Sequence, residues 1–315
     1  MLQCQFKLDV YEMILKEHPP ISINPEELQL TRDEASELAE ELKRQLRDGK
    51  RLKADQENIQ LLVAGLGDSR GLLRRTFSES LGVIGAAALP ALRVALLTSS
   101  NVTVRRAAAK TLKLVGDSNA LPDLLSALIN DPDPVVQGSA AGAMAIFGEE
   151  AAELLIKVLE NEESTAMQSG LARWGLAFVG AEAPEAIRKA AQSKHLEVRA
   201  AAIAALGDQI QSLNDKKAKA LLLKALDDPS PEVRAEATTL LGKLTDPNLS
   251  KDLLGSKLSD LNPQVRKSAA FSLMKSKSTQ ALPELKRREL LETDHDTAVV
   301  MKLAIEQLSR LERIE

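Results

Sequence analysis

The sequence predicts an all-α protein, a right-handed α-solenoid of about eight helical hairpins that follows an N-terminal helical cap. Three observations lead to this prediction: a phrase containing Asp, Pro and Val-Arg recurs along the chain, alanine-rich helices follow it, and only seven of the 315 residues are aromatic. Small aliphatic side chains must therefore fill the core. We assign residues 1–57 to the cap, an acidic helical extension, and residues 58–315 to the repeats.

The repeated phrase sets the length of the unit. Three segments share an apolar helix end, a tight turn with Asp and Pro, and a second apolar helix: LINDPDPVVQGSAAGAMAIFG (128–148), ALDDPSPEVRAEATTLLGKL (225–244) and KLSDLNPQVRKSAAFSLMKS (257–276). Arg199, Arg234 and Arg266 follow one another at steps of 35 and 32 residues. Steps of this size extend the pattern back to Arg74, which gives eight units from about residue 58.

Each unit reads as two helices joined by a turn. In KKAKALLLKAL (216–226) the apolar residues recur at helical spacing, and Asp228-Pro229-Ser230-Pro231 then interrupts the run. Proline disfavours a helical conformation of the residue before it and is welcome in the first turn of a helix. One such hairpin cannot bury both of its apolar stripes, so neighbouring hairpins must stack.

Residues 1–57 differ from the repeats. Thr31 and Glu34 have the spacing of a capping box, which predicts the start of an amphipathic helix, and Gly49 is a plausible stop. Nine basic and thirteen acidic residues make the segment acidic. We favour a cap over the first repeat, because a terminal repeat exposes an apolar face; an arm that binds a partner is the alternative.

Charge and hydropathy exclude several classes of protein. Residues 58–315 contain 32 basic and 32 acidic residues, so no basic excess favours a phosphate backbone, and we predict no nucleic-acid partner. The N-terminus lacks the basic and apolar regions of a secretory signal, and no uninterrupted apolar stretch approaches the length of a transmembrane helix. We therefore expect a cytoplasmic protein.

No catalytic constellation is recognisable. The G-x-G-x-x-G, P-loop, G-x-S-x-G and H-E-x-x-H patterns are absent, and one cysteine and three distant histidines exclude a Cys-rich zinc site. We interpret Cys4 as an inert thiol rather than a nucleophile. His195 and His295 stand in turns, where a solvated role is favoured over that of a general base or ligand. We predict no catalytic residue and no metal.

The most ordered polar feature is a series of arginines at the start of second helices. It consists of Arg74, Arg105, Arg199, Arg234 and Arg266. Each lies next to a turn acid or amide, such as Asp228 before Arg234 and Asp260 before Arg266, so stacked repeats would form an Asp–Arg ladder between layers. A basic track that binds acidic groups of a partner is the alternative. Gln137 and Gln168 interrupt the series.

Helix 165–179, TAMQSGLARWGLAFV, is apolar almost all round. The core-facing residues are expected to be Ala172, Leu176 and Val179. A second face then carries Met167, Leu171, Trp174 and Phe178, opposite the small residues Gly138, Ser139, Ala141, Gly142 and Ala145 of the preceding repeat. We predict that second helices line the concave side and that this face binds a partner through Trp174, Arg173, Phe178, Leu171, Met167 and Gln137. The alternative is that Trp174 is core.

The sequence motif of the repeats also resembles the repeats of a known family. The phrase Asp-Pro-x-x-x-Val-Arg and the alanine-rich helix after it, as in DPSPEVRAEATTLLGKL and NVTVRRAAAKTLKLVGD, resemble the HEAT-like repeats of phycobilin lyases. That family includes the E- and F-type phycocyanobilin lyase subunits and the phycobilisome-degradation HEAT proteins of cyanobacteria. The resemblance covers about residues 58–310, and its members that attach bilins hold the chromophore in the concave groove.

Two functions follow from the resemblance. Our first prediction is a non-enzymatic scaffold or chaperone-like adaptor, without a cofactor, that binds a phycobiliprotein or photosynthetic complex subunit in the cytoplasm or at the thylakoid surface. The alternative is a phycobilin lyase, or one subunit of a lyase, that joins a bilin to a phycobiliprotein cysteine. In that case a bilin would be bound, and His195 would be a poor candidate for the acid.

Overall fold

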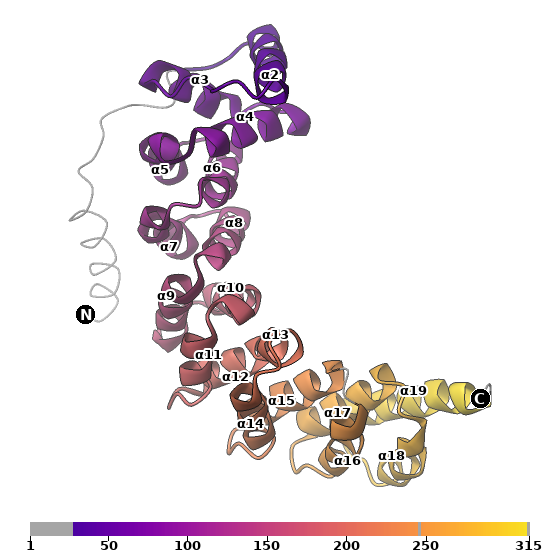
Figure 1. Cartoon of the computed structure of the whole chain (residues 1–315). Coiled ribbons are helices and arrows are strands. Elements are labelled where there is room, and N and C mark those ends of the chain that lie inside the picture. The colour runs from indigo at the N-terminus through magenta and orange to yellow at the C-terminus, as the bar shows by residue number, and fades with distance from the viewer. Residues whose placement is uncertain (1–27, 245–246, 314–315) are drawn as a thin grey trace. The chain divides into compact units, whose positions relative to one another are not determined.

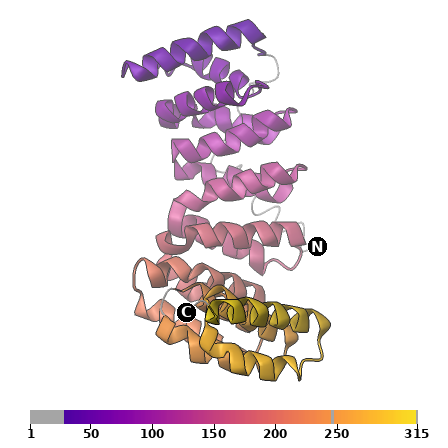
Figure 2. The same ribbon diagram turned by 90° about the vertical axis from the view of Figure 1, so that its right-hand side faces the viewer.

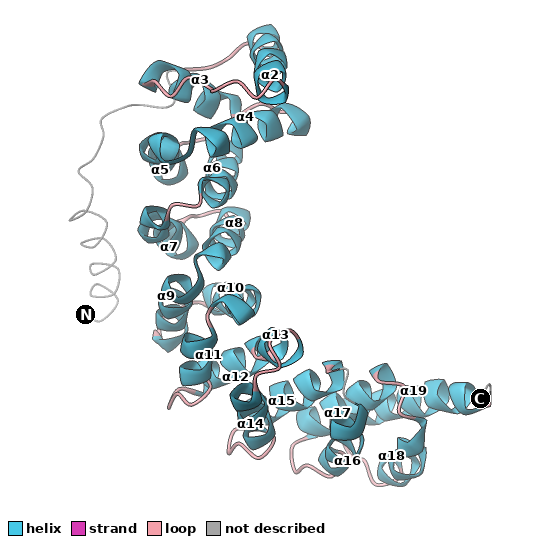
Figure 3. Ribbon diagram, in the orientation of Figure 1, coloured by secondary structure: helices cyan, strands magenta, loops and turns pink. Residues whose placement is uncertain are grey.

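The computed structural model describes residues 28–244 and 247–313, and for residues 247–251 it describes the backbone alone. The described residues form helices and turns and no strand, which confirms the predicted all-α class (Figure 3). Cys4 and the first part of the predicted cap lie outside the described residues. The chain divides into two compact units, residues 1–175 and 176–315.

The described part of the first unit starts with α2 (Arg32–Arg47) and continues with pairs of helices in two layers (Figure 1). The first helices of the pairs are α3 (Gln56–Gly65), α5 (Leu89–Thr98), α7 (Leu121–Asn130) and α9 (Gly148–Glu160). The second helices are α4 (Gly71–Ile84), α6 (Val102–Val115), α8 (Pro134–Met144) and α10 (Ala166–Val179), of which α10 crosses into the second unit. Short 3-10 turns at residues 85–88, 118–120 and 145–147 precede α5, α7 and α9.

The second helices of the first unit pack side by side. Helix α2 packs on α4, α4 on α6, and α6 on α8. Figure 2 shows this layer, from indigo to pink, as a row of helices that run across the view. Each helix therefore contributes a strip of its outward side to a common surface.

The second unit repeats the pattern from α11 onwards. Its first helices are α11 (Pro184–Ala190), α14 (Lys216–Ala225), α16 (Pro247–Lys257) and α18 (Leu282–Glu289), and its second helices are α12 (Leu196–Ala205), α15 (Pro231–Lys243), α17 (Pro263–Lys275) and α19 (His295–Glu312). The short helix α13 (Gly207–Gln211) follows α12, and 3-10 turns at residues 180–182 and 279–281 precede α11 and α18. Helices α12, α15, α17 and α19 pack in that order. The described residues thus contain eight helix pairs, as the spacing of the repeated phrase predicts.

The turn chemistry explains where second helices begin. Pro134, Pro231 and Pro263 occupy the first turn of α8, α15 and α17. The side chains of Asp133 and Asn262, which precede the first and last of these prolines, accept hydrogen bonds from backbone N–H groups of the new helix. The prolines therefore begin the helices that the sequence assigned to them.

Helix α2 docks on the first repeat. Thr31 and Glu34 form the predicted capping box, and Gly49, which follows the helix, has a φ of +64°. Ala35, Ala39 and Leu42 are buried on the side towards α4. The guanidinium of Arg70 donates to Ser36 Oγ at 2.8 Å and to the carbonyl of Arg32 at 3.0 Å. These contacts join α2 to the turn that precedes α4.

One described stretch, Gly71–Thr98, is long and apolar enough, by length and composition alone, to cross a membrane. It consists of α4, a 3-10 turn and α5, with Gly85 at a φ of +74° where α4 ends. Phe77, Leu81 and Leu92 of this stretch are fully buried among the helices. Part of its apolar character therefore belongs to the core of the first unit.

Candidate functional site

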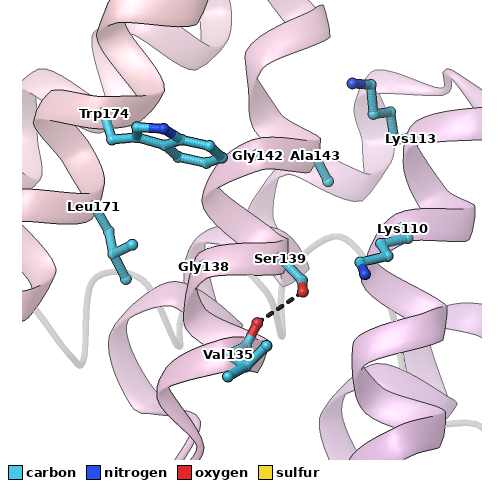
Figure 4. A pocket seen from close by; sticks show the side chains of 9 residues that line it. All are labelled: Lys110, Lys113, Val135, Gly138, Ser139, Gly142, Ala143, Leu171 and Trp174. Atoms are coloured by element: carbon cyan, nitrogen blue, oxygen red, sulfur yellow. Dashed lines mark hydrogen bonds between the residues drawn. The ribbon is translucent and has the colours of Figure 1, made fainter.

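An open groove of about 680 Å³ lies on the outer side of the second-helix layer in the first unit (Figure 4). Three consecutive second helices supply its lining: Lys110 and Lys113 from α6; Val135, Gly138, Ser139, Gly142 and Ala143 from α8; Leu171 and Trp174 from α10. Its volume falls within the range of about 300 to 1,000 Å³ that small-molecule sites occupy. We call this feature the α6–α8–α10 groove.

Small residues of α8 form the floor of the groove. Gly138 and Gly142 are one turn apart, so both fall on the side of α8 that faces outward, with Ser139 beside them. Ser139 Oγ donates to the carbonyl of Val135 at 2.7 Å, so the hydroxyl is satisfied within its own helix. Of the five floor residues named from the sequence, these three line the groove, whereas Ala141 is fully buried.

Helix α10 forms one wall. Ala172, Leu176 and Val179 are fully buried, as the helical spacing predicts. Trp174 then falls on another side of α10 and keeps 45% of its surface exposed. A Cβ atom at residue 142 would lie 3.0 Å from Cη2 of Trp174, so the indole edge reaches directly over the glycine. The alternative that Trp174 is a core residue is therefore wrong.

Helix α6 forms the opposite wall with two lysines. Lys110 and Lys113 are exposed and lie three positions apart in the sequence, which places both on the same side of α6. Neither ammonium group forms an ion pair with another described residue. Arg106, one turn earlier, is held by Asp133 at 3.0 Å. Sequence reasoning missed these lysines, and the signal that could have found them was a Lys-x-x-Lys pair on the exposed side of an alanine-rich helix.

The arrangement suits a flat, largely apolar ligand that carries negative charge at one edge. The floor offers little side-chain bulk, one wall offers an indole, and the other wall offers two cations. No carboxylate, imidazole or thiol lines the groove. Among the described residues no cluster of three or more His, Cys, Asp or Glu side chains could hold a metal ion. The lining residues thus offer a binding surface with an apolar floor, one indole and two ammonium groups.

The other residues of the predicted partner-binding set lie outside this lining. Met167 is 52% exposed on α10, and Phe178, in the second unit, is 60% exposed. Gln137 Nε2 donates to the carbonyl of Asp131 at 2.8 Å, which places its side chain at the turn before α8. Arg173 is half-buried on α10. Their role in binding a partner, and the concave position of the second helices, stay predictions.

The arginine series forms a regular set of contacts between repeats. In Arg234 the Nε and one terminal nitrogen donate to the carboxylate of Asp260, both at 2.8 Å, while the other nitrogen donates to the carbonyl of Asp228 at 2.9 Å. Arg199 forms the same fork with Asp228 at 3.0 Å, and Arg105 with Asp131 at 2.8 and 3.2 Å. Each arginine thus joins its own turn to the next one.

The arginine forks join successive repeats, as expected for a ladder between layers, and the structure shows which acid each arginine contacts. The sequence places Asp228 next to Arg234 and Asp260 next to Arg266, but each arginine contacts the backbone carbonyl of that residue rather than its carboxylate. The carboxylate that it contacts belongs to the following repeat, and for Arg266 this acid is Glu292. The ladder is therefore made by stacking and not within single turns.

Contacts in the ladder lower the pKa of Asp228, Asp260 and Glu292. Burial acts to raise the pKa of Asp260, but hydrogen bonds from Arg234 and from the backbone N–H of Asn262 outweigh it, so the pKa lies below its ordinary value. The balance is the same for Asp228, where Arg199 and the N–H of Ser230 donate. These hydrogen bonds stabilise the charged carboxylates, so each acid stays ionised at neutral pH.

Glu292, the ladder acid that Arg266 contacts, shows the same effect. The guanidinium of Arg266 holds the pKa of Glu292 below its usual range, and the same contact raises the pKa of Arg266. Backbone N–H groups of Thr293 and Asp294 donate to Oε1 of Glu292 at 3.0 and 2.9 Å. The acid therefore fixes its own turn as well as the preceding arginine.

The series is interrupted at Gln137 and Gln168, as the sequence predicts, and it also differs at Arg74, which the sequence placed in the ladder. Arg74 donates to the carbonyl of Asp68, and the next turn has Ser99 where Asp131 stands one repeat later. Gln137 occupies the position in α8 that Arg234 occupies in α15, and its Nε2 donates to the carbonyl of Asp131 at 2.8 Å. Gln168 Nε2 donates to the carbonyl of Ile129 at 2.8 Å. These neutral amides contact turn or helix carbonyls in place of an Arg–carboxylate fork.

The two described histidines occupy helix starts. His195 precedes α12, where its backbone N–H donates to Ser193 Oγ at 3.2 Å and its side chain makes no capping hydrogen bond. His295 is the exposed first residue of α19. Neither histidine lines the α6–α8–α10 groove.

Comparisons with known proteins agree with this architecture. The family model of HEAT repeats matches residues 89–177 and 184–256. The chain is 47% identical over 281 residues to the "Bilin biosynthesis protein MpeU" of Synechococcus sp. (strain WH8020), an alignment that covers 89% of this chain and 95% of the relative.

Solved structures with a similar fold include two with low sequence identity. The protein YIBA_ECOLI is 17% identical, with a TM-score of 0.38 and coverage of 90% of this chain and 98% of that one. The complex of CpcE and CpcF of phycocyanin lyase from Nostoc sp. PCC7120 gives 22% identity and a TM-score of 0.31, with coverage of 59% and 99%. These likenesses concern the helical repeat fold alone.

Proposed function

The chain belongs to the HEAT-repeat family and to the family of the bilin biosynthesis protein MpeU, and from this premise we propose that it is a phycobilin lyase, or one subunit of a lyase. It joins a bilin to a cysteine of a phycobiliprotein. The observation that carries the proposal is the 47% identity to MpeU, which extends over 95% of that protein. A match of this length includes the repeats of both compact units rather than one shared motif.

Our first prediction from the sequence, a non-enzymatic scaffold, is contradicted by this relationship. Many binding proteins share this type of repeat, and the scarcity of aromatic residues argued against a bound chromophore. A relative named for bilin biosynthesis, matched along nearly its whole length, favours the alternative that the sequence left open. The scaffold is therefore withdrawn as the function.

The proposed reaction is an addition. The S–H of an acceptor cysteine adds across a carbon–carbon double bond on the outer pyrrole ring of the bilin. The new bond joins sulfur to carbon, and the proton goes to the neighbouring carbon. Nothing leaves, no electrons are exchanged, and the acceptor gains the full mass of the bilin.

Such an addition demands positioning more than acid–base machinery. A thiolate is already a strong nucleophile, so holding the bilin in one orientation against the acceptor thiol supplies much of the rate. The groove offers that kind of binding surface and contains no carboxylate or imidazole. We assign no catalytic residue, and the phycobiliprotein is the partner that presents the cysteine. The cytoplasm and the thylakoid surface stay the predicted location.

The test is a reconstituted attachment reaction. Purified protein is incubated with an apo-phycobiliprotein and with phycocyanobilin or phycoerythrobilin in separate reactions. Denaturing gels read by zinc-enhanced fluorescence, together with intact-mass spectrometry, should show an acceptor heavier by one bilin. An acceptor with its target cysteine changed to alanine is the matched control. Equal adduct yields with and without this protein, for both bilins, would contradict the proposal.

A further inference from the structure

We propose that the α6–α8–α10 groove is the bilin site, with a pyrrole ring against the indole of Trp174 and the two propionate groups held by Lys110 and Lys113. This inference rests on the proposed function, because it names where and how the substrate of that reaction is bound. It assigns one ligand, a flat linear tetrapyrrole with two carboxylates, to residues from three consecutive repeats.

The first argument is the shape of the floor. A Cβ atom at Gly138 would lie 3.6 Å from Leu171, whereas one at Gly142 would stand 3.0 Å from the indole of Trp174. The absence of a side chain at residue 142 therefore lets the indole lie low over α8. A larger residue there would lift the ring and fill the groove, so the glycine shapes a shallow space that suits a planar ligand.

The second argument is the exposed indole. Trp174 keeps nearly half of its surface open on the side of the groove. Aromatic rings prefer offset stacking on other flat π-systems, and such pairs contribute to binding beyond the area that they bury. A bilin offers several pyrrole rings for such a contact.

The third argument is charge. Lys110 and Lys113 bring two ammonium groups to the wall opposite Trp174, as Figure 4 shows. A bilin carries two propionates on its two central rings, so its charged edge and its apolar rings lie on different parts of one molecule. The groove separates cations from indole in the same way. Charge complementarity therefore selects an anionic planar ligand over a neutral one.

The experiment measures binding without attachment. Phycocyanobilin is titrated into the full-length protein and followed by its visible absorbance and by quenching of Trp174, the single tryptophan of the chain. The dimethyl ester of the bilin, which keeps the rings and loses both charges, is titrated in parallel. We expect the free acid to bind the native protein about tenfold more tightly than the ester, since two ammonium groups then face two carboxylates.

Variants separate the two halves of the site. Lys110→Gln/Lys113→Gln should weaken binding of the free acid about tenfold and leave binding of the ester unchanged. Trp174→Ala, read by bilin absorbance, should weaken acid and ester alike. The matched control is Lys194→Gln/Lys216→Gln, which removes the same charge from exposed lysines of the second unit. Circular dichroism checks that all variants keep their helical content.

The outcomes also distinguish this inference from the proposed function. Adduct formation together with unchanged bilin affinity in the lysine and Trp174 variants would overturn the groove and leave the lyase intact. Bilin binding that depends on the groove residues, without any adduct, would contradict the lyase function and support the groove as the bilin site. If native protein binds acid and ester equally, the assignment of the lysines is wrong. If the variants lose the phycobiliprotein but still bind bilin, the groove is a protein contact and the inference is overturned.

Discussion

Trp174 and Gly142 are so close that a methyl group on residue 142 would stand 3.0 Å from Cη2 and 3.1 Å from Cζ3 of the indole. The two residues come from second helices of successive repeats, so this contact fixes the height of the indole over α8. The position of the ring therefore depends on a hydrogen atom in place of a side chain.

Substitution of this glycine should move the indole without unfolding the helix. Gly142→Ala is expected to shift Trp174 outward by a few tenths of an ångström and to shift the tryptophan emission towards the red. Alanine favours a helix by about 0.5 to 1 kcal/mol over glycine, so thermal stability should change little. Gly138→Ala, whose new methyl meets Leu171 at 3.6 Å, is the matched control. Identical emission spectra for the two variants would show that the contact does not set the position of the ring.

Two residues on α10 should respond very differently to truncation. Trp174 is 45% exposed and Leu176 is fully buried. Leu176→Ala is expected to destabilise the protein by about 3 kcal/mol through lost burial and an unfilled cavity, whereas Trp174→Ala should cost about 1 kcal/mol. Urea unfolding followed by circular dichroism measures both. A larger loss for Trp174→Ala than for Leu176→Ala would mean that the indole is part of the core.

A break in the arginine ladder should cost more than the loss of a surface ion pair. The side chains of Arg234 and Asp260 are 16% and 9% exposed, and Arg234 also donates to the turn carbonyl of Asp228. Arg234→Gln is expected to lower the free energy of unfolding by about 2 kcal/mol. Arg75→Gln removes an exposed pair with Glu79 and should have no measurable effect. Equal unfolding midpoints for the two variants would show that the ladder contributes no more than a surface pair.

The same ladder predicts how stability depends on pH. The pKa values of Asp228, Asp260 and Glu292 are lower in the folded protein than their ordinary values, which are about 3.9 for Asp and 4.3 for Glu. Their contribution to the free energy of unfolding is therefore fully present when the pH is above these ordinary pKa values. It is lost as the pH falls through the lower pKa values of the folded protein. We expect the melting temperature to change little between pH 7 and 5 on account of these groups and to fall below about pH 4.

A single variant tests this assignment. Asp260→Asn should lower the melting temperature at pH 7. Its difference from the native protein should shrink as the pH falls below about 4, because the unfolded native chain then binds a proton at Asp260 that the folded state resists. Circular dichroism melts at a series of pH values give the comparison. A difference that stays constant down to pH 3 would assign the acid sensitivity to other groups.

The fold follows closely from the sequence because its causes are local. Pro231 and Pro263 begin helices in the structure as they do in the pattern, and the buried face of α10 follows from helical spacing alone. Each of these features is decided within one hairpin. The number of hairpins then follows from the number of repeats, and the rotation between neighbouring hairpins is not needed to predict it.

The groove and the ladder register follow less directly because they depend on how hairpins stack. Trp174 and Gly142 could be related from the sequence, since they lie in adjacent repeats. Lys113 lies two repeats away from Trp174, and the offset between helices accumulates with every layer. The same offset decides that Asp228 receives Arg199 rather than Arg234. The residue spacing in the sequence therefore predicts neither that Lys113 and Trp174 line one groove nor that Asp228 binds Arg199.

The ladder has a consequence for the length of the array. Because every fork reaches from one turn to the acid at the equivalent position of the next, the turns at Asp228 and Asp260 are interchangeable. Excision of residues 229–260 would leave Arg199 on Asp228 and Arg266 on Glu292, so no guanidinium or carboxylate of the ladder would lose its partner. The second unit is thus built so that whole modules can be gained or lost while every junction still closes.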